Sequence, residues 1–369
     1  MATERLYQKN VYLRKAELVV SEIREYKGKK QVACESTIFF PEGGGQLCDL
    51  GTLGGIAVTD VKEDKETGTV WHTVADASGF EPGRTVTAVL DWQRRFDHMQ
   101  QHAGDHMIAS ALWRLLGGVT IGLHISQDVS TIDVAMPEGV TRISPEDIRR
   151  VEDDVNTRIQ RDVPVRCWFP EPGELQGLPL RKPPTVTEHV RVVAIGEDEM
   201  VACGGTHPST AGQIGLVKIL GVAPARGKMR VSFVAGMRAL NDYRACFDRA
   251  HEAANLLSTG TENLPAHVAA LQEALKGAEY ELNKLRRDAA IAELKEAIAA
   301  APTLRSGAKV LAKLLEGDGN LVKEAASRLI RQPGIVALLG AEQGDGKAAF
   351  VFARSQDVDL NMGQLISQA

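Results

Sequence analysis

Residues 94–116, with the sequence RRFDHMQQHAGDHMIASALWRLL, contain a helical pattern from which the other elements can be placed. Apolar side chains recur at helical spacing without an internal proline, which predicts an amphipathic helix; they are Met99, Met107, Ile108, Ala111, Leu112 and Leu115. His102 and His106 stand four residues apart in it, so they share one face with Cβ atoms about 5–6 Å apart and can reach one metal ion. A histidine pair alone is more often surface decoration than a metal site, so this prediction needs further ligands.

Short runs of alternating apolar and polar residues precede this helix, between residues 10 and 90. Clusters of Gly, Asp and Lys separate them, which predicts a string of strands forming a small barrel or twisted sheet. Strands return from residue 117 to about 234, interrupted by a predicted helix at 144–161 that begins with serine, proline and two acids. Because strands and helices mix without a regular βαβ order, the expected fold class is α+β.

The chain is predicted to be helical almost throughout residues 239–301. A heptad pattern runs through this segment, formed by Val268, Leu271, Leu275, Ala278, Leu282, Leu285, Ala289 and Ala292. Either an antiparallel helical hairpin or a dimeric coiled coil would bury this row, and the sequence leaves both open. After Pro302, a predicted helix at 321–330 and two buried strands at 335–340 and 348–353 indicate a small α/β unit.

A second potential ligand pair, Cys203-Gly-Gly-Thr-His207, follows about a hundred residues after the histidines. Gly204 and Gly205 allow the backbone to turn back without a Cβ clash, so a thiolate and an imidazole can face one ion. Together with His102 and His106, this gives four nitrogen and sulfur ligands, a set that favours tetrahedral zinc. Four protein ligands are typical of a closed structural site, whereas hydrolysis needs an open position, so we expect one ligand to be exchangeable and suggest His207.

Composition places the chain among ordinary globular proteins, with 44% hydrophobic and 25% charged residues. No apolar stretch approaches the roughly 20 residues that cross a bilayer, and the N-terminal residues lack the apolar core of a secretory signal, so a cytoplasmic protein without a membrane partner is predicted. A net charge of −5 does not favour nucleic-acid binding overall, although a local basic face could still bind phosphates. Five scattered cysteines argue against a disulfide framework, and the four outside the motif are predicted to pack in the core: Cys34, Cys48, Cys167 and Cys246.

The order HxxxH then CxxxH resembles the editing domain shared by alanyl- and threonyl-tRNA synthetases and the stand-alone alanyl-tRNA editing proteins called AlaX. Three further stretches are similar to family segments: the glycine-rich FFPEGGGQLCDLG at 39–51, STID at 130–133 and GKMRVSFVAG at 227–236. The resemblance covers about residues 5–245. Residues 246–369 look like the helical linker and C-terminal domain of alanyl-tRNA synthetase, whose usual glycine-rich tail is missing here, so this domain is expected to be truncated.

The resemblance implies four parts and assigns roles to individual residues. Gln46 would either face the pocket and orient water or substrate, or be a turn residue whose amide satisfies the loop backbone. Thr131 would either offer its hydroxyl to a serine side chain or be an ordinary strand threonine. Arg94 and Arg95 could touch tRNA phosphates, and Asp105 is expected to be a solvated charge. The parts are a β-barrel-like subdomain (1–92), a zinc-binding α+β editing domain (93–238), a helical, coiled-coil-like linker (239–301) and a C-terminal α/β domain (302–369).

The implied activity is zinc-dependent hydrolysis of mischarged Ser-tRNA-Ala, with Gly-tRNA-Ala as a further candidate substrate. No phosphate-binding loop of the type GxxxxGK[ST] is present, so neither ATP nor tRNA charging is expected. Mischarged tRNA-Ala is the predicted partner, and a homodimer through the C-terminal helical region is one option. Two other functions stay open at this stage: a non-catalytic, zinc-stapled module that binds tRNA or protein, and a zinc hydrolase of a small ester.

Overall fold

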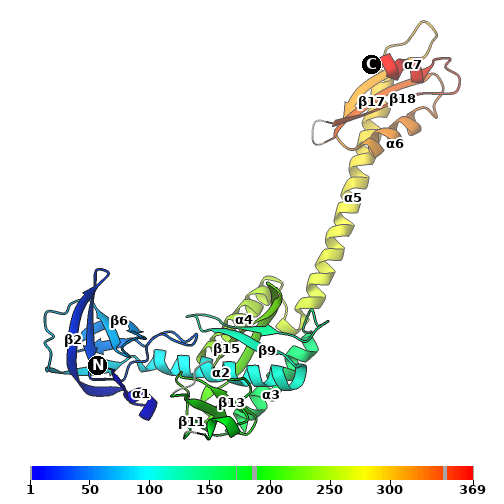
Figure 1. Ribbon diagram of the computed structural model, residues 1–369. Coiled ribbons are helices and arrows are strands. Elements are labelled where there is room, and N and C mark those ends of the chain that lie inside the picture. The colour runs from blue at the N-terminus through cyan, green and yellow to red at the C-terminus, as the bar shows by residue number, and fades with distance from the viewer. Residues whose placement is uncertain (1, 172, 185–188, 344–346, 369) are drawn as a thin grey trace. The chain divides into compact units, whose positions relative to one another are not determined.

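The computed structural model describes residues 2–368 except 172, 185–188 and 344–346 (Figure 1). The chain divides into two compact units, Met1–Asp248 and Arg249–Ala369. Both contain helices and sheets, which confirms the α+β class. No helix in the described ranges combines the length and the apolar character needed to cross a membrane.

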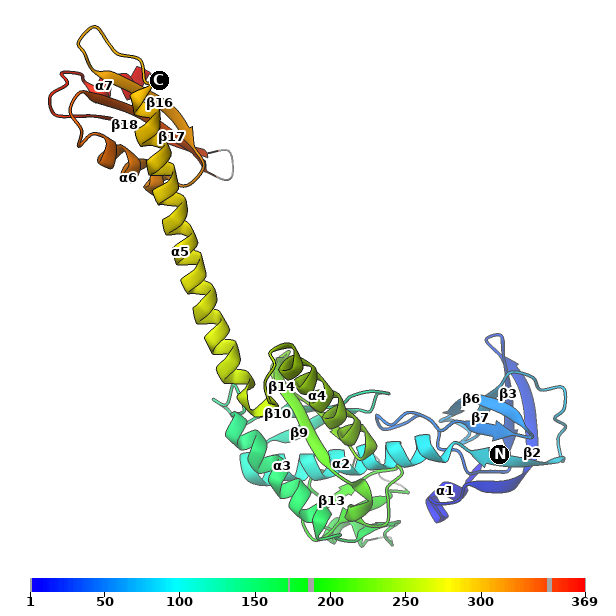
Figure 2. The ribbon, with the colours of Figure 1, turned by 180° about the vertical axis from the view of Figure 1, so that it is seen from behind.

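A closed six-stranded barrel forms the first part of the N-terminal unit, with its strands in blue in Figure 2. The order around it is β2 (Lys15–Tyr26), β3 (Lys29–Cys34), β7 (Val70–Val74), β6 (Ile56–Glu63), β5 (Gly51–Leu53) and β8 (Thr85–Leu90). Leu18, Val32, Phe39 and Leu53 are fully buried in its core. Beside the barrel, β1 (Glu4–Arg5) pairs in parallel with β4 (Ser36–Thr37), and α1 (Leu6–Lys9) follows β1.

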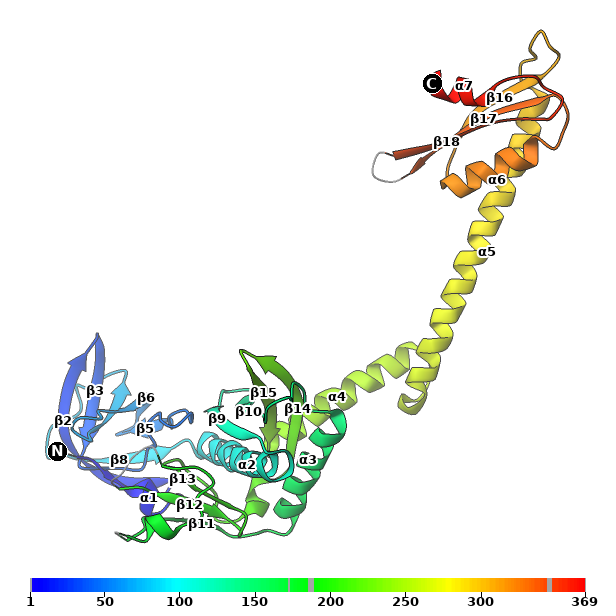
Figure 3. The same ribbon diagram turned by 45° about the vertical axis from the view of Figure 1, so that its right-hand side comes forward.

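The second part of this unit is built around α2 (Trp92–Leu116), which lies between two antiparallel sheets (Figure 3). One sheet has the order β14 (Val217–Ala225), β15 (Lys228–Ala235), β10 (Ser130–Ala135) and β9 (Val119–His124). The other consists of β11 (Val165–Trp168), β12 (Val192–Ile195) and β13 (Glu199–Ala202). The remaining helical elements are α3 (Pro145–Gln160), η1 (Leu175–Gly177), η2 (Ala211–Ile214) and α4 (Met237–Leu256), which runs past the boundary of the unit.

The two ends of α2 follow the local sequence, but the prediction that α2 is amphipathic is wrong. The Asp91 carboxylate caps its first turn, and Gly117 ends it in the left-handed conformation. Every residue from 98 to 112 is buried, including several polar ones, because sheets and helices cover this helix on all sides. Gln101 satisfies its amide by bonding both backbone groups of Ala235 at 2.9 Å. A polar side chain buried in this way needs an internal partner. The buried polar residues of α2 therefore lie where the helix contacts neighbouring elements and do not form a solvent-exposed face.

The C-terminal unit is a three-stranded sheet with helices on both faces. After η3 (Thr261–Asn263) and α5 (Leu264–Ala299), β17 (Ile335–Gln343) lies between the parallel β16 (Lys309–Leu315) and the antiparallel β18 (Lys347–Arg354). α6 (Gly319–Leu329) covers one face together with the end of α5, and α7 (Met362–Gln368) covers the other. The predicted helix and both predicted strands of this unit are present.

Only the last part of α5 is packed within its unit. Ile291, Leu294 and Ile298 enter the core of the C-terminal sheet. The heptad positions that precede them are between 45% and 64% exposed at Val268, Leu271, Leu275, Leu282 and Leu285. Within residues 249–343 and 347–368 no second helix covers this row, so the described part of this unit contains no hairpin partner for it.

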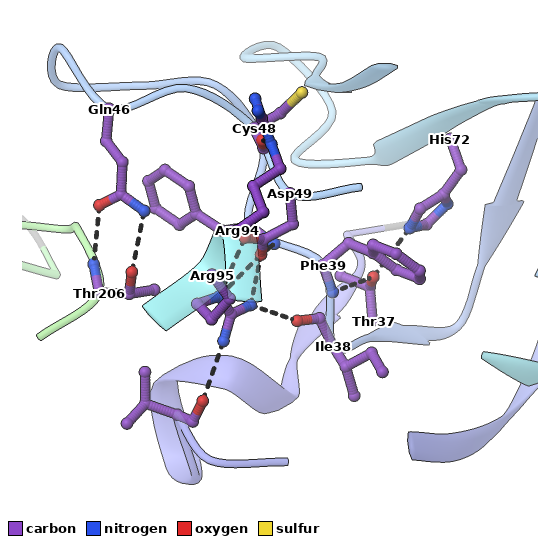
Figure 4. A network of polar contacts seen from close by, with 12 residues as sticks. Thr37, Ile38, Phe39, Gln46, Cys48, Asp49, His72, Arg94, Arg95 and Thr206 are labelled. Carbon is purple, nitrogen blue, oxygen red and sulfur yellow. Dashed lines mark hydrogen bonds and ion pairs between the residues drawn. The ribbon is translucent and has the colours of Figure 1, made fainter. Parts of the chain in front are cut away.

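A buried histidine makes the barrel sensitive to acid. The Nδ1–H of His72 donates to the Val32 carbonyl at 3.0 Å. Its Nε2 accepts from the Thr37 hydroxyl at 2.8 Å (Figure 4). Burial lowers the pKa of His72 to about 4 from 6.5, so the unfolded chain binds the proton more tightly. Stability is then lost as pH falls from 6.5 towards 4, by about 2 kcal/mol between pH 7 and pH 5.

Replacing this histidine tests the prediction. In urea denaturation, His72→Gln is expected to flatten the pH dependence of the unfolding free energy by about 2 kcal/mol over this interval, because glutamine can accept the Thr37 hydrogen bond but does not titrate. An equal slope in the wild-type protein and the variant would assign the acid sensitivity to other groups.

Candidate metal centre

Four predicted ligands meet at one point of the N-terminal unit. His102 and His106 come from α2, and Cys203 and His207 come from the loop after β13. Their ligand atoms all lie within 4.8 Å of one another, and the Cys203 Sγ is 3.4 Å from the Nε2 atoms of both His102 and His207. The three imidazoles are at least 96% buried. This cluster could hold a metal ion.

The charge state of Cys203 also suits metal binding. Burial opposes ionisation of the Cys203 thiol, yet the three histidines beside it hold its pKa well below the usual value. A cysteine binds a metal as the thiolate, so the protein supplies this ligand in the required form. The backbone N–H of Gly205 also donates to the sulfur at 3.4 Å, which favours the negative charge.

Two of the imidazoles are oriented through their other nitrogen. The Nδ1 of His102 bonds the side-chain oxygen of Gln46 at 2.8 Å. The same amide is held by Thr206, whose N–H donates to the amide oxygen at 3.1 Å and whose hydroxyl accepts from the amide nitrogen at 2.8 Å (Figure 4). The Nδ1 of His106 lies 3.3 Å from the Glu199 carboxylate. Such partners fix the ring and leave the opposite nitrogen for the metal.

A partly buried arginine, Arg181, holds Glu199 in turn. The Nε of Arg181 donates to Glu199 at 2.8 Å, its second terminal nitrogen donates at 3.0 Å, and its remaining nitrogen donates to the Thr120 hydroxyl at 2.7 Å. Although burial opposes ionisation, His106 and Arg181 keep the pKa of Glu199 below its usual value. The sequence analysis did not identify either residue, because they lie on a separate strand and loop with no local motif.

The CxxxH loop approaches α2 closely at Gly205. A Cβ at this position would lie 2.3 Å from Cε1 and 2.4 Å from Nδ1 of His102, whereas one at Gly204 would meet no atom within 4 Å. Of the two glycines, only Gly205 is therefore required by the geometry. The buried guanidinium of Arg191 fixes the loop by donating to the carbonyls of Cys203 and Gly205 at 3.1 and 2.8 Å.

A cavity of about 470 Å³ opens beside the cluster, and its wall includes His102, His106 and Cys203. The cavity does not reach His207, which is 98% buried, so the expectation that His207 is the exchangeable ligand finds no support. Thr120 and Asp105 also line it.

The structure brings Gln46 to the cluster but not Thr131. The Gln46 side chain is completely buried and faces His102 and Thr206 rather than the cavity. Thr131 lies on β10 opposite His124 and Ser232 and is not part of the cavity wall. Thr120, on β9, is a threonine that does line the cavity.

Asp105 is not the solvated charge that the sequence analysis expected. It is 93% buried and lines the cavity, because a residue three positions after His102 lies on nearly the same helical face. Burial raises the pKa of its carboxyl. Its spacing from His102 was the signal that could have identified it.

The expectation for Arg95 is corrected, whereas that for Arg94, which is partly exposed, stays a prediction. Arg95 is completely buried in an ion pair with Asp49, so it cannot touch tRNA phosphates, and the Nε of Arg94 donates to the Cys48 carbonyl at 3.0 Å. Cys34 and Cys48 are buried as predicted. Cys167 and Cys246 are exposed, so the prediction that they pack in the core is wrong.

Comparison with known proteins agrees with this site. Residues 190–232, which include Cys203 and His207, match the family model described as the threonyl and alanyl tRNA synthetase second additional domain. Over 99% of its length the chain is 30% identical to an alanine–tRNA ligase of Haloquadratum walsbyi and 29% identical to that of Halorubrum lacusprofundi, but it spans only 40% of each ligase.

A shorter relative is matched over most of its own length. The alanyl-tRNA editing protein AlaX-L of Pyrococcus horikoshii is 30% identical over 77% of this chain and 71% of the relative. Of the ligand cluster, Cys203 and His207 fall within the residues that the family model matches, and His102 and His106 precede them. The chain therefore belongs to the AlaX-L family of alanyl-tRNA editing proteins.

Proposed function

We propose that the chain is a trans-editing deacylase that hydrolyses the ester bond of Ser-tRNA-Ala, takes Gly-tRNA-Ala as a further substrate and leaves Ala-tRNA-Ala intact. The observation that carries this proposal is a cavity of about 470 Å³ whose wall includes three of the four potential metal ligands. Serine differs from alanine by one hydroxyl, and the amino-acid pocket of a synthetase excludes such a small addition poorly. A second site that hydrolyses the wrongly charged tRNA therefore improves accuracy.

Zinc is the proposed ion. A tetrahedral zinc ion with bonds of about 2.3 Å to sulfur and about 2.0–2.1 Å to nitrogen separates those ligands by roughly 3.6 Å, close to the 3.4 Å measured from Cys203 to His102 and His207. One thiolate and three imidazoles also form a donor set that zinc accepts. When bound, zinc would supply Lewis acidity towards the ester carbonyl and lower the pKa of a coordinated water.

The residues around the cluster have complementary proposed tasks. Gln46 and Glu199 hold the rings of His102 and His106, which makes them positioning residues. The Thr120 hydroxyl, on the cavity wall, is the group that we assign to recognition of the substrate hydroxyl in place of Thr131. A polar partner of this kind rejects a substrate that lacks the hydroxyl far better than an apolar wall rejects one that has it.

The partner in this proposal is mischarged tRNA-Ala. Lys182 is exposed on the wall of the cavity and forms no ion pair with a described residue, so its ammonium is available to a phosphate near the 3′ end of the tRNA. We also propose that the exposed apolar row of α5 pairs with the same row of a second chain, because the heptad spacing of these residues suits a coiled coil. We place the protein in the cytoplasm, where its substrate is made.

Incubation of the purified protein with Ser-tRNA-Ala tests the proposal. We expect one zinc per chain, release of serine, and a loss of this activity by about 100-fold or more after chelation or in His102→Ala and Cys203→Ala. Asp133→Asn serves as the control, because Asp133 pairs with Arg230 on the sheet and does not line the cavity. Binding of tRNA without release of serine would favour a non-catalytic module, and turnover of free seryl esters without regard to tRNA would favour a small-ester hydrolase.

A further inference from the structure

Asp105 is a buried carboxylate that faces the cavity beside the metal ligands. It lies three residues after His102 and one before His106 on α2, and only 7% of its surface is exposed. Because the cavity wall includes Asp105 together with both histidines, the exposed remainder of the side chain faces the space in which the substrate would bind.

Nothing in the described chain pairs with this carboxylate. It takes part in no hydrogen bond or ion pair with the residues 2–171, 173–184 and 189–248 of its unit, and it does not belong to the group of metal-ligand atoms. The two other acids of the cavity wall are engaged, since Glu63 pairs with Arg5 and Glu42 with Lys62. Asp105 is thus the one unpaired acid on the described part of the wall.

A buried carboxylate without a partner is energetically costly, and a cation that enters the cavity can compensate for this cost. The basic residues on the wall do not fill this role. Arg5 is paired with Glu63, and Arg181 is committed to Glu199 and Thr120. Lys182 is exposed and forms no ion pair with Asp105. The complementary ligand group is therefore a small cation that arrives with the substrate.

We propose that Asp105 binds the α-ammonium group of the aminoacyl ester. The inference rests on the proposed function. An ester whose carbonyl lies beside His102 and His106 carries its ammonium on the adjacent carbon, within the cavity whose wall Asp105 shares with both ligands. Asp105 then requires a free amino group in the substrate, so that peptidyl and other N-blocked esters are excluded.

The test compares two substrates that differ only in this group, seryl-tRNA-Ala and 3-hydroxypropionyl-tRNA-Ala, in the wild-type protein, Asp105→Asn and Asp133→Asn. We expect kcat/KM of the wild-type protein to be about 10- to 100-fold higher for the seryl ester, since hydrogen bonds to charged groups have this magnitude. Asp105→Asn should lose most of this preference while retaining its metal content and its rate on the hydroxypropionyl ester within about 2-fold. Asp133→Asn should resemble the wild-type protein.

Equal losses on both substrates, or an unchanged preference in Asp105→Asn, would overturn the assignment. The binding of two non-hydrolysable adenosine amides, with a seryl and a 3-hydroxypropionyl group, separates this inference from the proposed function. If the wild-type protein hydrolyses neither ester, the proposed deacylase fails. A preference for the seryl amide that disappears in Asp105→Asn would still support the ammonium site, and no preference would refute it.

Discussion

Gly205→Ala is expected to disrupt the metal centre and to reduce deacylation by about 100-fold or more. The added methyl group would lie 2.3 Å from the His102 ring, closer than real Cβ contacts come. This ring cannot yield easily, because it is 97% buried and Gln46 holds its Nδ1. A shift of the ring therefore removes one ligand from the ion, and zinc analysis after dialysis together with the deacylation rate measures the effect.

Gly204→Ala is the matched control. The two glycines are neighbours, neither adopts a positive φ, and a methyl group at Gly204 meets no atom within 4 Å. We expect its zinc content to be unchanged and its rate to stay within about 2-fold of the wild-type rate. Similar losses in both variants would show that flexibility of the loop matters rather than the close approach to His102.

Arg95→Met is expected to lower the unfolding free energy of the N-terminal unit by about 3–5 kcal/mol, the cost of leaving one member of a buried ion pair uncompensated. Both Arg95 and Asp49 are completely buried, and the Nε of Arg95 lies 3.0 and 2.9 Å from the two carboxylate oxygens (Figure 4). The same guanidinium donates to the carbonyls of Ile38 and Val11 at 2.7 and 3.0 Å. One side chain of α2 thus ties together three segments of the barrel region.

Arg94→Met provides the comparison for this measurement in urea. Arg94 is partly exposed and its side chain donates a hydrogen bond to the Cys48 carbonyl, so its loss should cost about 1 kcal/mol or less. Equal destabilisation by the two substitutions would contradict this prediction, because burial of the Arg95–Asp49 pair would then add nothing to the loss of unfolding free energy.

The ligand cluster could be predicted because its members form two short motifs. A spacing of four on a helix and a CxxxH loop each carry a local signal, so His102, His106, Cys203 and His207 could be identified before their contacts were known. Glu199 and Arg181 carry no such signal. Their role depends on β13 lying beside α2, which only the tertiary structure shows.

The errors at Asp105 and Arg95 share one cause, which is the assumption that charged residues on a helix face water. Asp105 and Arg95 are both buried on α2, the first against the cavity and the second against Asp49. The apolar positions of this helix do follow a helical period, but a helix enclosed by sheets on two sides also buries its polar residues. In the same way, the heptad pattern of α5 was visible in the sequence, whereas its exposure within the described unit was not.

The division of the ligands between a helix and a distant loop has a consequence for biosynthesis. His102 and Cys203 are 101 residues apart, and a ribosome that adds about 5–20 residues per second needs roughly 5–20 s to pass from the first to the second. The nascent chain can close its barrel and seat Arg95 against Asp49 during this time, while the paired imidazoles still lack their sulfur. For the proposed zinc site, metal loading is therefore expected late in maturation, when the second half of the unit docks onto the first.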